Sequence, residues 1–159
     1  MQKLLKLMLD GEALSTEQMG KILGVTQAEL DAQLKQLTDA GILLGWRPVI
    51  NADVEVSKLP AAIELRITPE RDGGYDRLAQ RVSKFDEVDS CFLMSGAYDL
   101  LLFVKADSLK DVASFVYEKL ATIKGVTSTA THFFLKTYKT QGFLIKTEPH
   151  SDDRLIYSP

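Results

Sequence analysis

The segment Ser95-Gly96-Ala97-Tyr98-Asp99 gathers within five residues the groups that a small charged ligand needs. Ser95 supplies a hydroxyl, Gly96 permits close approach of the backbone, and Asp99 supplies a carboxylate. A free amino acid carries a carboxylate and an ammonium on one carbon, so its site needs hydrogen-bond donors beside an acceptor carboxylate. The segment therefore predicts an amino-acid contact. An ordinary hairpin turn favours the same glycine and aspartate for backbone reasons, and both interpretations stay open.

A second candidate site lies near the amino terminus, where two helix-capping patterns follow one another. Ser15-x-x-Gln18 predicts the start of one helix and Thr26-x-x-Glu29 predicts the start of the next. Gly24-Val25 makes a tight turn between them, which is typical of a helix-turn-helix. An earlier helix is indicated by apolar residues at helical spacing, namely Leu4, Leu5, Met8 and Leu9. Three such helices also suit a packing or dimerisation unit, which is the alternative.

The helix that follows Thr26 is the candidate DNA-reading element. Leu30, Leu34 and Leu37 form its core side, and Gly41 ends it. A recognition helix presents the opposite side to the major groove. Thr26 and Gln27 stand at its amino end, where backbone amides can meet a phosphate. The residues predicted to contact DNA are Thr26, Gln27, Ala28, Ala32, Lys35 and Gln36, together with Arg47 beyond the helix.

The net charge of residues 1–50 limits the affinity for DNA that we expect of a single dimer. The chain has 159 residues and a formal net charge of −3, which argues against a protein that coats nucleic acid non-specifically. Residues 1–50 contain five basic and six acidic side chains, a net charge of −1. Each absent basic contact removes one neutralised phosphate and flattens the salt dependence of binding. We therefore expect a single dimer to bind weakly and several dimers to act together on one DNA.

Composition excludes several other classes. The chain is 45% hydrophobic and 26% charged, unlike a disordered segment, and no apolar run approaches the ~20 residues of a membrane span. Cys91 is the single cysteine, so no intrachain disulfide forms, and its apolar neighbours predict a buried, inert thiol. The two histidines, His132 and His150, have no metal-ligand spacing. We expect a cytoplasmic protein without metal or cofactor, whose first nine residues form an amphipathic helix rather than a signal peptide.

The rest of the chain predicts one α+β module. Ala61–Ile67 alternates with a strand's period of two, and Leu100–Val104 is an apolar central strand. With a helix over Tyr75–Val82, a strand over Val88–Met94, a helix from Ser108 to Leu120 and a long strand over Val126–Tyr138, the order is βαββαβ, the ferredoxin-like arrangement. This arrangement leaves one face of the sheet without helices, so we expect a dimer.

The expected domains follow from these patterns. They are a helix-turn-helix domain at 1–50, a linker at 51–59, a ferredoxin-like effector-binding and oligomerisation domain at 60–142, and a tail at 143–159. The apolar end of the tail, Leu155-Ile156-Tyr157, suits either a frayed terminus or a short strand added to a neighbouring subunit.

Three segments give the chain a resemblance to a known family. They are Leu93–Leu101 (LMSGAYDLL), Ile123–Thr131 (IKGVTSTAT), and Asp39–Trp46 (DAGILLGW) followed by Val49–Asn51. Over roughly residues 1–142 the chain resembles the Lrp/AsnC family of feast/famine transcriptional regulators. The resemblance implies a winged helix-turn-helix domain joined to a ferredoxin-like domain. It also implies dimers assembled into tetramers, octamers or larger discs that bind double-stranded DNA and often sense an amino acid.

The resemblance also implies where the effector binds. In the family, the loop between the middle strands, the start of the last helix of the second domain and the last strand line a cleft between subunits. The positions carried over are Gly96, Tyr98, Asp99, Leu109, Thr131, His132 and Phe133. Taken singly, Leu109 and Phe133 also suit core packing, and His132 suits a structural hydrogen bond. Family members such as the leucine-responsive regulator often carry several arginines in the recognition helix, where this chain has Gln33, Lys35 and Gln36.

The sequence thus predicts a sequence-specific DNA-binding transcriptional regulator of the Lrp/AsnC type, modulated by an amino acid or related metabolite bound between subunits. It predicts no enzymatic activity. An oligomeric sensor or assembly partner that does not bind DNA is the alternative that the acidic recognition helix favours. Sirohaem-type decarboxylases share the two-domain design, but two histidines and an acidic Asp99 loop suit a polycarboxylate substrate poorly.

Overall fold

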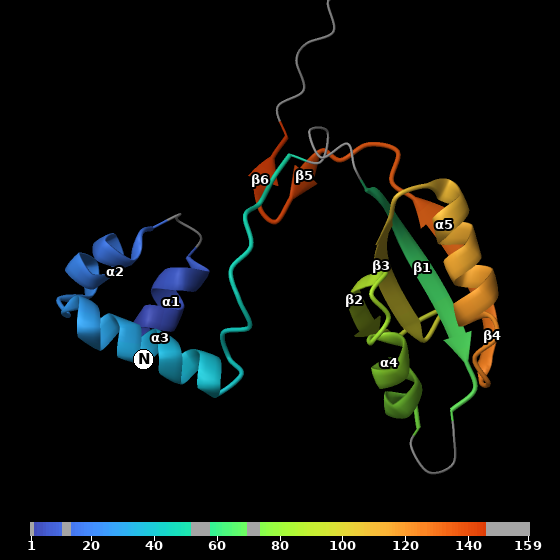
Figure 1. The fold of residues 1–159 in the computed structure, drawn as a ribbon, viewed down its shortest axis with the longest axis horizontal. Helices are drawn as coiled ribbons and strands as arrows, with labels where there is room; N and C mark the ends of the chain where they lie inside the picture. Colours follow the sequence, from blue (N-terminus) through green and yellow to red (C-terminus); the bar gives the residue numbers. More distant parts are fainter. Residues whose placement is uncertain (1, 11–13, 52–57, 70–73, 146–159) are drawn as a thin grey trace, which may run out of the picture. The chain divides into compact units, whose positions relative to one another are not determined.

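The computed structural model describes residues 2–10, 14–51, 58–69 and 74–145. The chain divides into two compact units, residues 1–48 and residues 49–159 (Figure 1). The predicted strand-forming end of the tail, Leu155-Ile156-Tyr157, and most of the predicted linker lie outside the described residues. None of the helices in the described parts of the chain is long and apolar enough to span a membrane.

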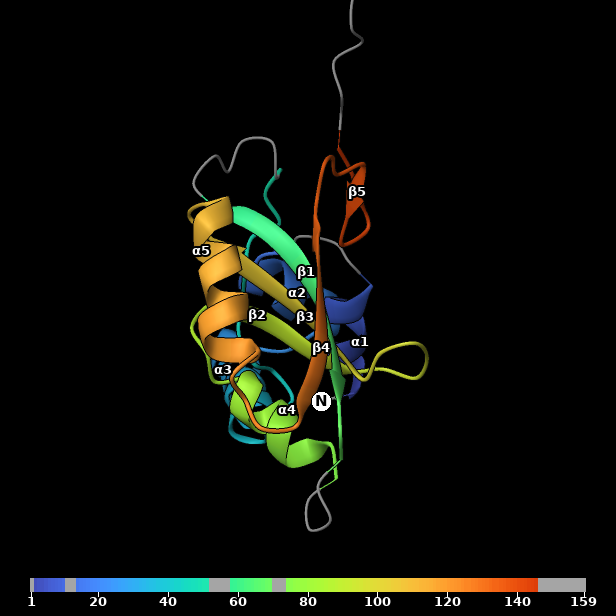
Figure 2. The same ribbon diagram turned by 90° about the vertical axis from the view of Figure 1, so that its right-hand side faces the viewer.

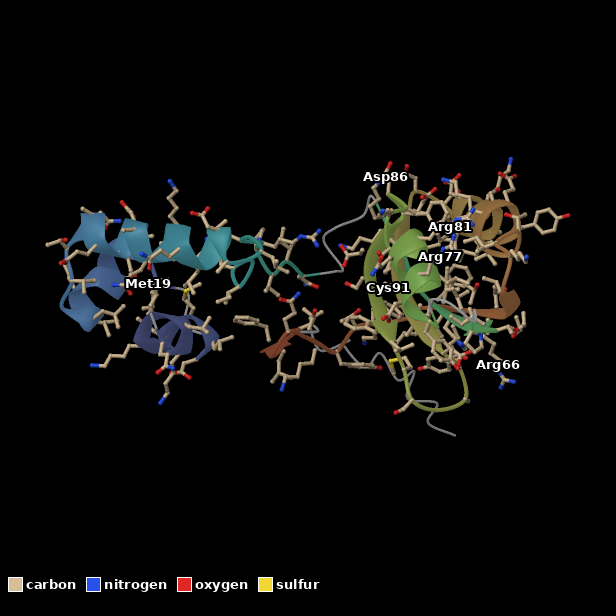
Figure 3. All side chains as sticks on the ribbon, turned by 90° about the horizontal axis from the view of Figure 1, so that it is seen from below. Met19, Arg66, Arg77, Arg81, Asp86 and Cys91 are labelled. Carbon is tan, nitrogen blue, oxygen red and sulfur yellow. The ribbon has the colours of Figure 1, made fainter. Side chains whose placement is uncertain are left out.

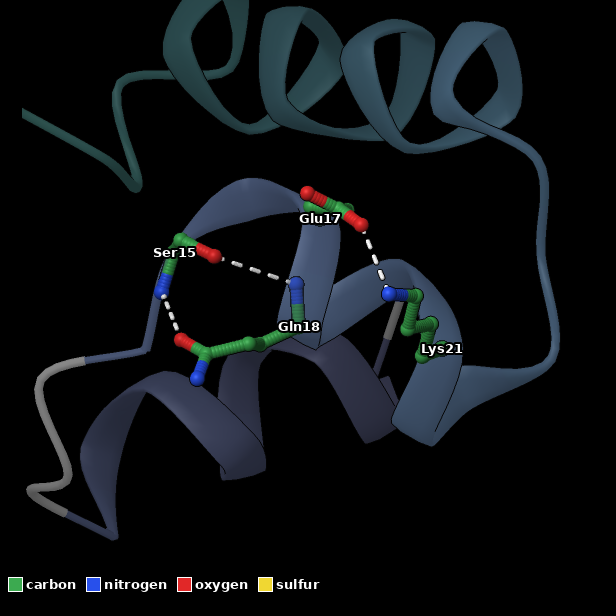
Figure 4. Close-up of polar contacts among 4 residues, drawn as sticks. All are labelled: Ser15, Glu17, Gln18 and Lys21. Carbon is green, nitrogen blue, oxygen red and sulfur yellow. Dashed lines mark hydrogen bonds and ion pairs between the residues drawn. The ribbon is translucent and has the colours of Figure 1, made fainter.

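The described residues of the first unit form three helices, α1 (Gln2–Leu9), α2 (Thr16–Leu23) and α3 (Gln27–Asp39). Both predicted capping boxes are confirmed. At α2, the Gln18 N–H donates to Ser15 Oγ over 3.2 Å, and the Ser15 N–H donates to Gln18 Oε1 over 2.8 Å (Figure 4). Leu4, Met19, Leu30 and Leu37 are buried where the helices meet. Local hydrogen bonds and four core side chains thus hold α3 in place.

The second unit is a four-stranded antiparallel sheet with the strand order β2-β3-β1-β4. Its elements follow the predicted βαββαβ order. They are β1 (Leu59–Ile67), α4 (Asp76–Val82), β2 (Val88–Leu93), β3 (Leu100–Ala106), α5 (Leu109–Ser114) continued by the π-helical η1 (Phe115–Leu120), and β4 (Val126–Phe133). This is the predicted ferredoxin-like α+β fold.

The helices of this unit cover one face of the sheet. Figures 1 and 2 show α4 and α5 on the same side of β1 and β3. The side chains between the layers are fully buried, among them Ile63, Leu65, Leu102 and Leu120. Cys91 lies half-buried against this core (Figure 3), and burial raises the pKa of its thiol, in line with the inert role expected from sequence.

The opposite face of the sheet carries aromatic side chains that the helices do not cover. Phe103 of β3 lies edge-on to Phe92 of β2, with ring centroids 6.0 Å apart, and its centroid is 6.1 Å from that of Phe134. Phe92 and Phe134 remain 48% and 43% exposed. An apolar cluster of this kind on a sheet is typical of a surface that packs on another protein.

The length predicted for the last strand is wrong. β4 ends at Phe133, and a separate hairpin follows, formed by β5 (Lys139–Thr140) and β6 (Phe143–Leu144). Gln141 and Gly142 form the turn of this hairpin with φ of 45° and 92°, a conformation that reverses the chain. The Thr-rich and aromatic composition continues past Phe133, so composition alone did not reveal the break. After α3, residues 43–51 of the described chain form no strand.

Candidate DNA-binding and effector sites

The candidate DNA contacts lie on the exposed side of α3. Leu30 and Leu37 face the three-helix core. All the residues predicted to contact DNA are exposed, namely Thr26, Gln27, Ala28, Ala32, Lys35, Gln36 and Arg47. Because Ala28 and Ala32 lie one turn apart, with Lys35 and Gln36 one turn further, they form a single stripe along the helix.

The amino end of α3 is occupied by one of its own carboxylates. Glu29 Oε2 accepts hydrogen bonds of 2.8 Å from both the Thr26 N–H and the Thr26 hydroxyl, and the Glu29 N–H donates to Thr26 Oγ1 over 3.3 Å. The hydrogen bonds from the Thr26 backbone and then from its hydroxyl lower the pKa of Glu29. A phosphate at this end would therefore meet the free amides of the first turn beside a fixed negative charge, which weakens the predicted contact.

The turn between α2 and α3 is tight because Gly20 lacks a side chain. A Cβ on this buried residue would lie 3.3 Å from the Val25 carbonyl oxygen. A shallow hollow runs beside the turn and is lined by Glu17, Gly20, Lys21, Gly24, Val25, Thr26, Gln27 and Glu29. Lys21, its only lysine, pairs with Glu17 over 2.6 Å (Figure 4), so the hollow offers an anion little net positive charge.

One polar contact on α3 involves a residue that sequence analysis did not assign. Gln27 Nε2 donates to Asp31 Oδ1 over 2.7 Å, and both residues are exposed. The signal in the sequence is the spacing of four residues between a glutamine and an aspartate, which places the two side chains one helical turn apart.

In the candidate effector loop, Asp99 is anchored to the end of β1. Its N–H donates to the Leu65 carbonyl over 2.9 Å, and its Oδ2 accepts from the Ile67 N–H over 2.8 Å. Its carbonyl accepts from the Met94 N–H over 2.8 Å, which closes the turn between β2 and β3. Asp99 thus has a structural role of the kind the hairpin interpretation requires. A carboxylate has about four acceptor positions, so the Ile67 bond leaves capacity for a ligand.

The other loop residues present a mixed surface. Ser95, Gly96 and Ala97 are exposed, whereas Tyr98 and Asp99 are half-buried. Gly96 has a φ of 147°, a conformation that disfavours any side chain. The tip is therefore open to a ligand, while its base is fixed to the sheet.

Two of the remaining effector candidates, Leu109 and Phe133, lie toward the opposite end of the sheet. Phe133 pairs with Ala61, four strand residues or about 13 Å from Leu65, and Leu109 follows β3 beyond Ala106, which pairs with Leu59. Leu109 is 60% exposed and so is not a core residue, whereas Phe133 packs against the core. One chain therefore does not bring the loop and these residues together.

His132 lies on the sheet face that has no helices. It is exposed, and its Nε2 is 3.2 Å from Glu64 Oε1 on the neighbouring strand. This contact fits the structural interpretation of His132. Thr131, the residue before it, is half-buried.

The two units together define a class of protein: a helix-turn-helix module for DNA joined to a ferredoxin-like module for sensing and assembly. Residues 61–144 match the Lrp/AsnC ligand binding domain. The chain belongs to the Lrp/AsnC family of transcriptional regulators.

Relatives and solved structures agree with this assignment. The chain is 34% identical to the HTH-type transcriptional regulator YugG of Bacillus subtilis, over 99% of this chain and 95% of that protein. It is 26% identical to the proline dehydrogenase transcriptional activator of Rhizobium radiobacter, over 88% and 90% of the two chains. A transcriptional regulator of Neisseria meningitidis, solved in complex with L-Met, is 27% identical with a TM-score of 0.65, covering 87% of this chain and 89% of that one.

A more distant structure shows the same fold. AsnC of E. coli is 18% identical with a TM-score of 0.63, over 88% of this chain and 93% of that one. With these relatives, the helix-turn-helix identifies the chain as a DNA-binding transcriptional regulator.

The cap of α3 predicts a pH-dependent stability. In Thr26→Ala the helix loses its N-cap, and we expect the free energy of unfolding at pH 7 to fall by about 1 kcal/mol. The pKa of Glu29 is lowered in the folded state, so its contribution is present above the ordinary carboxyl pKa and is lost as pH falls through the lowered value. The difference between wild type and variant should therefore narrow in acid. Urea unfolding followed by circular dichroism, at fixed protein concentration, measures it.

Thr26→Ser is the control because it keeps the hydroxyl and should behave like wild type at every pH. A difference between Thr26→Ala and wild type that stays constant down to pH 3 would show that the Glu29 charge takes no part in the cap.

Because Asp99 anchors the candidate effector loop, two substitutions of this residue should lower the free energy of unfolding by different amounts. Asp99→Ala leaves the Ile67 N–H without its acceptor and should lower the free energy of unfolding by about 1–3 kcal/mol. Asp99→Asn keeps an acceptor oxygen and should cost less than half as much. Chemical unfolding of both variants at one protein concentration tests this, and equal losses would contradict the anchoring role.

Proposed function

We propose that this regulator reads DNA through the exposed stripe of α3 and responds to an amino acid bound between subunits. The single observation that carries the DNA part is the placement of every predicted α3 contact on the exposed side of a helix that both capping and a tight turn fix. Because such a regulator must reach DNA, we propose that the protein is cytoplasmic.

The composition of the stripe favours base contacts over phosphate attraction. Ala28 and Ala32 are small, so the helix can enter the major groove closely and touch thymine methyl groups. Gln36 can read base edges, and Lys35 is the only cation of α3, against three carboxylates. A net charge of −2 on the helix lowers the affinity of each copy for every sequence alike. Useful affinity then comes from several copies bound side by side on one DNA.

We propose that the uncovered sheet face packs on a second copy of the chain. The cluster of Phe92, Phe103 and Phe134 supplies an apolar centre. The charged side chains of Glu64 and Arg66 on β1 lie on the same uncovered face. A centre of aromatic residues with a charged rim is the usual composition of a protein interface. Dimers would then assemble further into tetramers or octamers.

The effector site is proposed to be shared between copies. The loop Ser95–Asp99 lies at the Leu65 end of β1, whereas Leu109, His132 and Phe133 lie toward its other end. Thr131 pairs with Ile63, midway along β1. A two-fold axis between subunits brings opposite ends together, so the loop of one copy can face these residues of another. Asp99 would accept the ammonium, and the amides of the open tip would donate to the carboxylate. The L-Met complex of the Neisseria meningitidis protein supports an amino acid as the ligand class.

The alternative function is an oligomeric sensor that does not bind DNA. The observation that favours it is the carboxylate fixed at the amino end of α3, where a DNA-binding helix needs positive potential. A gel-shift titration at low salt, with DNA from upstream of the gene and an oligomeric protein sample, separates the two. A complete absence of a shifted band would establish the alternative.

Lys35 gives the DNA proposal a quantitative test. We expect Lys35→Ala to weaken binding to all sequences about equally and to reduce the slope of log K against log salt by about one. The physical reason is the loss of one neutralised phosphate. Fluorescence anisotropy at several salt concentrations measures the slope.

Lys110→Ala serves as the control, because it removes the same charge from an exposed site on α5. It should leave the slope unchanged. An equal change of slope in both variants would mean that overall charge, rather than contact through α3, governs binding.

Asp99 gives the effector proposal its test. We expect calorimetric titration with the twenty common amino acids, taken one at a time, to identify at least one ligand of the wild-type protein. Asp99→Asn keeps the acceptor for Ile67 but removes the charge, so it should weaken that ligand at least about tenfold, as loss of a charge-assisted hydrogen bond predicts. Unchanged affinity in a folded Asp99→Asn variant would exclude Asp99 as the ammonium contact.

A further inference from the structure

The side chain of Gln27, at the start of α3, is oriented by a hydrogen bond to Asp31. Gln27 is the first residue of the helix and is exposed, and its side-chain Nε2 donates to Asp31 Oδ1 over 2.7 Å. Asp31 lies one turn further along on the exposed side, with Lys35 one turn beyond it. The contact favours one orientation of the Gln27 amide over the others that a glutamine at a helix terminus adopts.

This orientation limits the hydrogen bonds that Gln27 can still offer. The amide has two N–H groups and one carbonyl oxygen, and one N–H is occupied by Asp31. One donor and one acceptor therefore remain for a ligand. The major-groove edge of adenine presents the complementary pair, the N7 acceptor and the N6–H donor. Guanine presents two acceptors there, so the remaining pair cannot satisfy both of them.

We infer that Asp31 is a positioning residue that orients Gln27 to read one adenine in each half-site. The inference rests on the proposed function, in which the amino end of α3 enters the major groove. First-turn residues of a recognition helix are the ones that meet base edges. Asp31 then contributes to base preference even though its charge opposes binding to DNA.

Two other roles for Asp31 make different predictions. If the carboxylate acts only by repulsion, its removal strengthens binding to every sequence equally. If Asp31 itself contacts a base, it accepts a hydrogen bond from cytosine N4, and its removal relaxes a preference for cytosine. Only the positioning role links Asp31 to the same base position as Gln27.

The experiment uses the full-length chain. Preferred sites are first selected by the wild-type protein from a randomised DNA pool. Dissociation constants are then measured for the selected site and for single-base changes at each position. We expect wild type to prefer adenine at one position by about tenfold, and both Gln27→Ala and Asp31→Ala to reduce that preference to about twofold. The double variant should lose no more than either single one, since both act through one contact.

Two further variants distinguish the orienting role of Asp31 from the effect of its negative charge. Asp31→Asn keeps an oxygen that accepts from Gln27 Nε2, so the adenine preference should stay within about twofold of wild type. Asp10→Ala removes an equal charge from the same unit outside α3 and should leave the preference unchanged. Circular dichroism confirms that each variant retains its helices.

Three outcomes overturn the inference. The first is a uniform gain in affinity in Asp31→Ala with the adenine preference intact, and the second is a relaxed cytosine preference at a position that Gln27→Ala does not affect. The third is a wild-type protein that binds no DNA, which overturns the proposed function as well. The first two leave DNA binding in place and reject only the role of Asp31.

Discussion

The one-sided covering of the four-stranded sheet is the constraint on which the second unit depends. Ile63, Leu65 and Ile67 are buried under the helices, while Glu64 and Arg66 between them face the other way, because successive strand residues alternate. The helices therefore bury one face of the sheet, and the aromatic cluster on the other face remains uncovered. The proposed assembly with further copies would cover this open face.

In the first unit, local hydrogen bonds set the electrostatics of the recognition helix. The Thr26–Glu29 capping box stabilises the start of α3 but places a carboxylate where DNA-binding helices benefit from positive potential. Lys35 is the only cation along the helix. If α3 binds DNA as proposed, its attraction to phosphate is weak, and contacts with base edges would have to carry a larger share of the free energy of specific binding. A side chain that is pre-oriented, as Gln27 is by Asp31, loses less conformational entropy on forming such a contact.

Short-range features were predictable from the sequence, and features set by strand register were not. Both capping boxes follow from hydrogen bonds between residues three apart, so four letters of sequence specify them. The bond from Ile67 to Asp99 joins residues 32 positions apart, and only the pairing of β1 with β3 brings them together. Similarly, the distance between Leu109 and the Asp99 loop depends on which end of each strand they follow. The resemblance named these residues as a set for an intersubunit cleft, which stays a prediction, and it carried no geometry for a single chain.

The observed secondary structure differs from the predicted one in two places. The helix predicted over residues 109–120 is present, but its second half is π-helical, and the Ala121 N–H reaches back to the Val116 carbonyl over 2.8 Å. Apolar periodicity does not distinguish the two helix types over so short a segment. The strand that breaks after Phe133 is followed by the β5–β6 hairpin, whose turn at Gln141–Gly142 places a glutamine in a left-handed conformation that its residue type rarely adopts.

β1 connects the proposed effector contact with the proposed subunit interface. Its backbone at Leu65 and Ile67 holds Asp99, while the alternating side chains of Glu64 and Arg66 point toward the face that would meet another copy. A ligand bound to the remaining acceptor positions of the Asp99 carboxylate would therefore act on a residue that is anchored to the strand carrying the proposed interface side chains. Thermodynamic linkage makes such an effect reciprocal: if the amino acid changes assembly, assembly changes the affinity for the amino acid by the same factor.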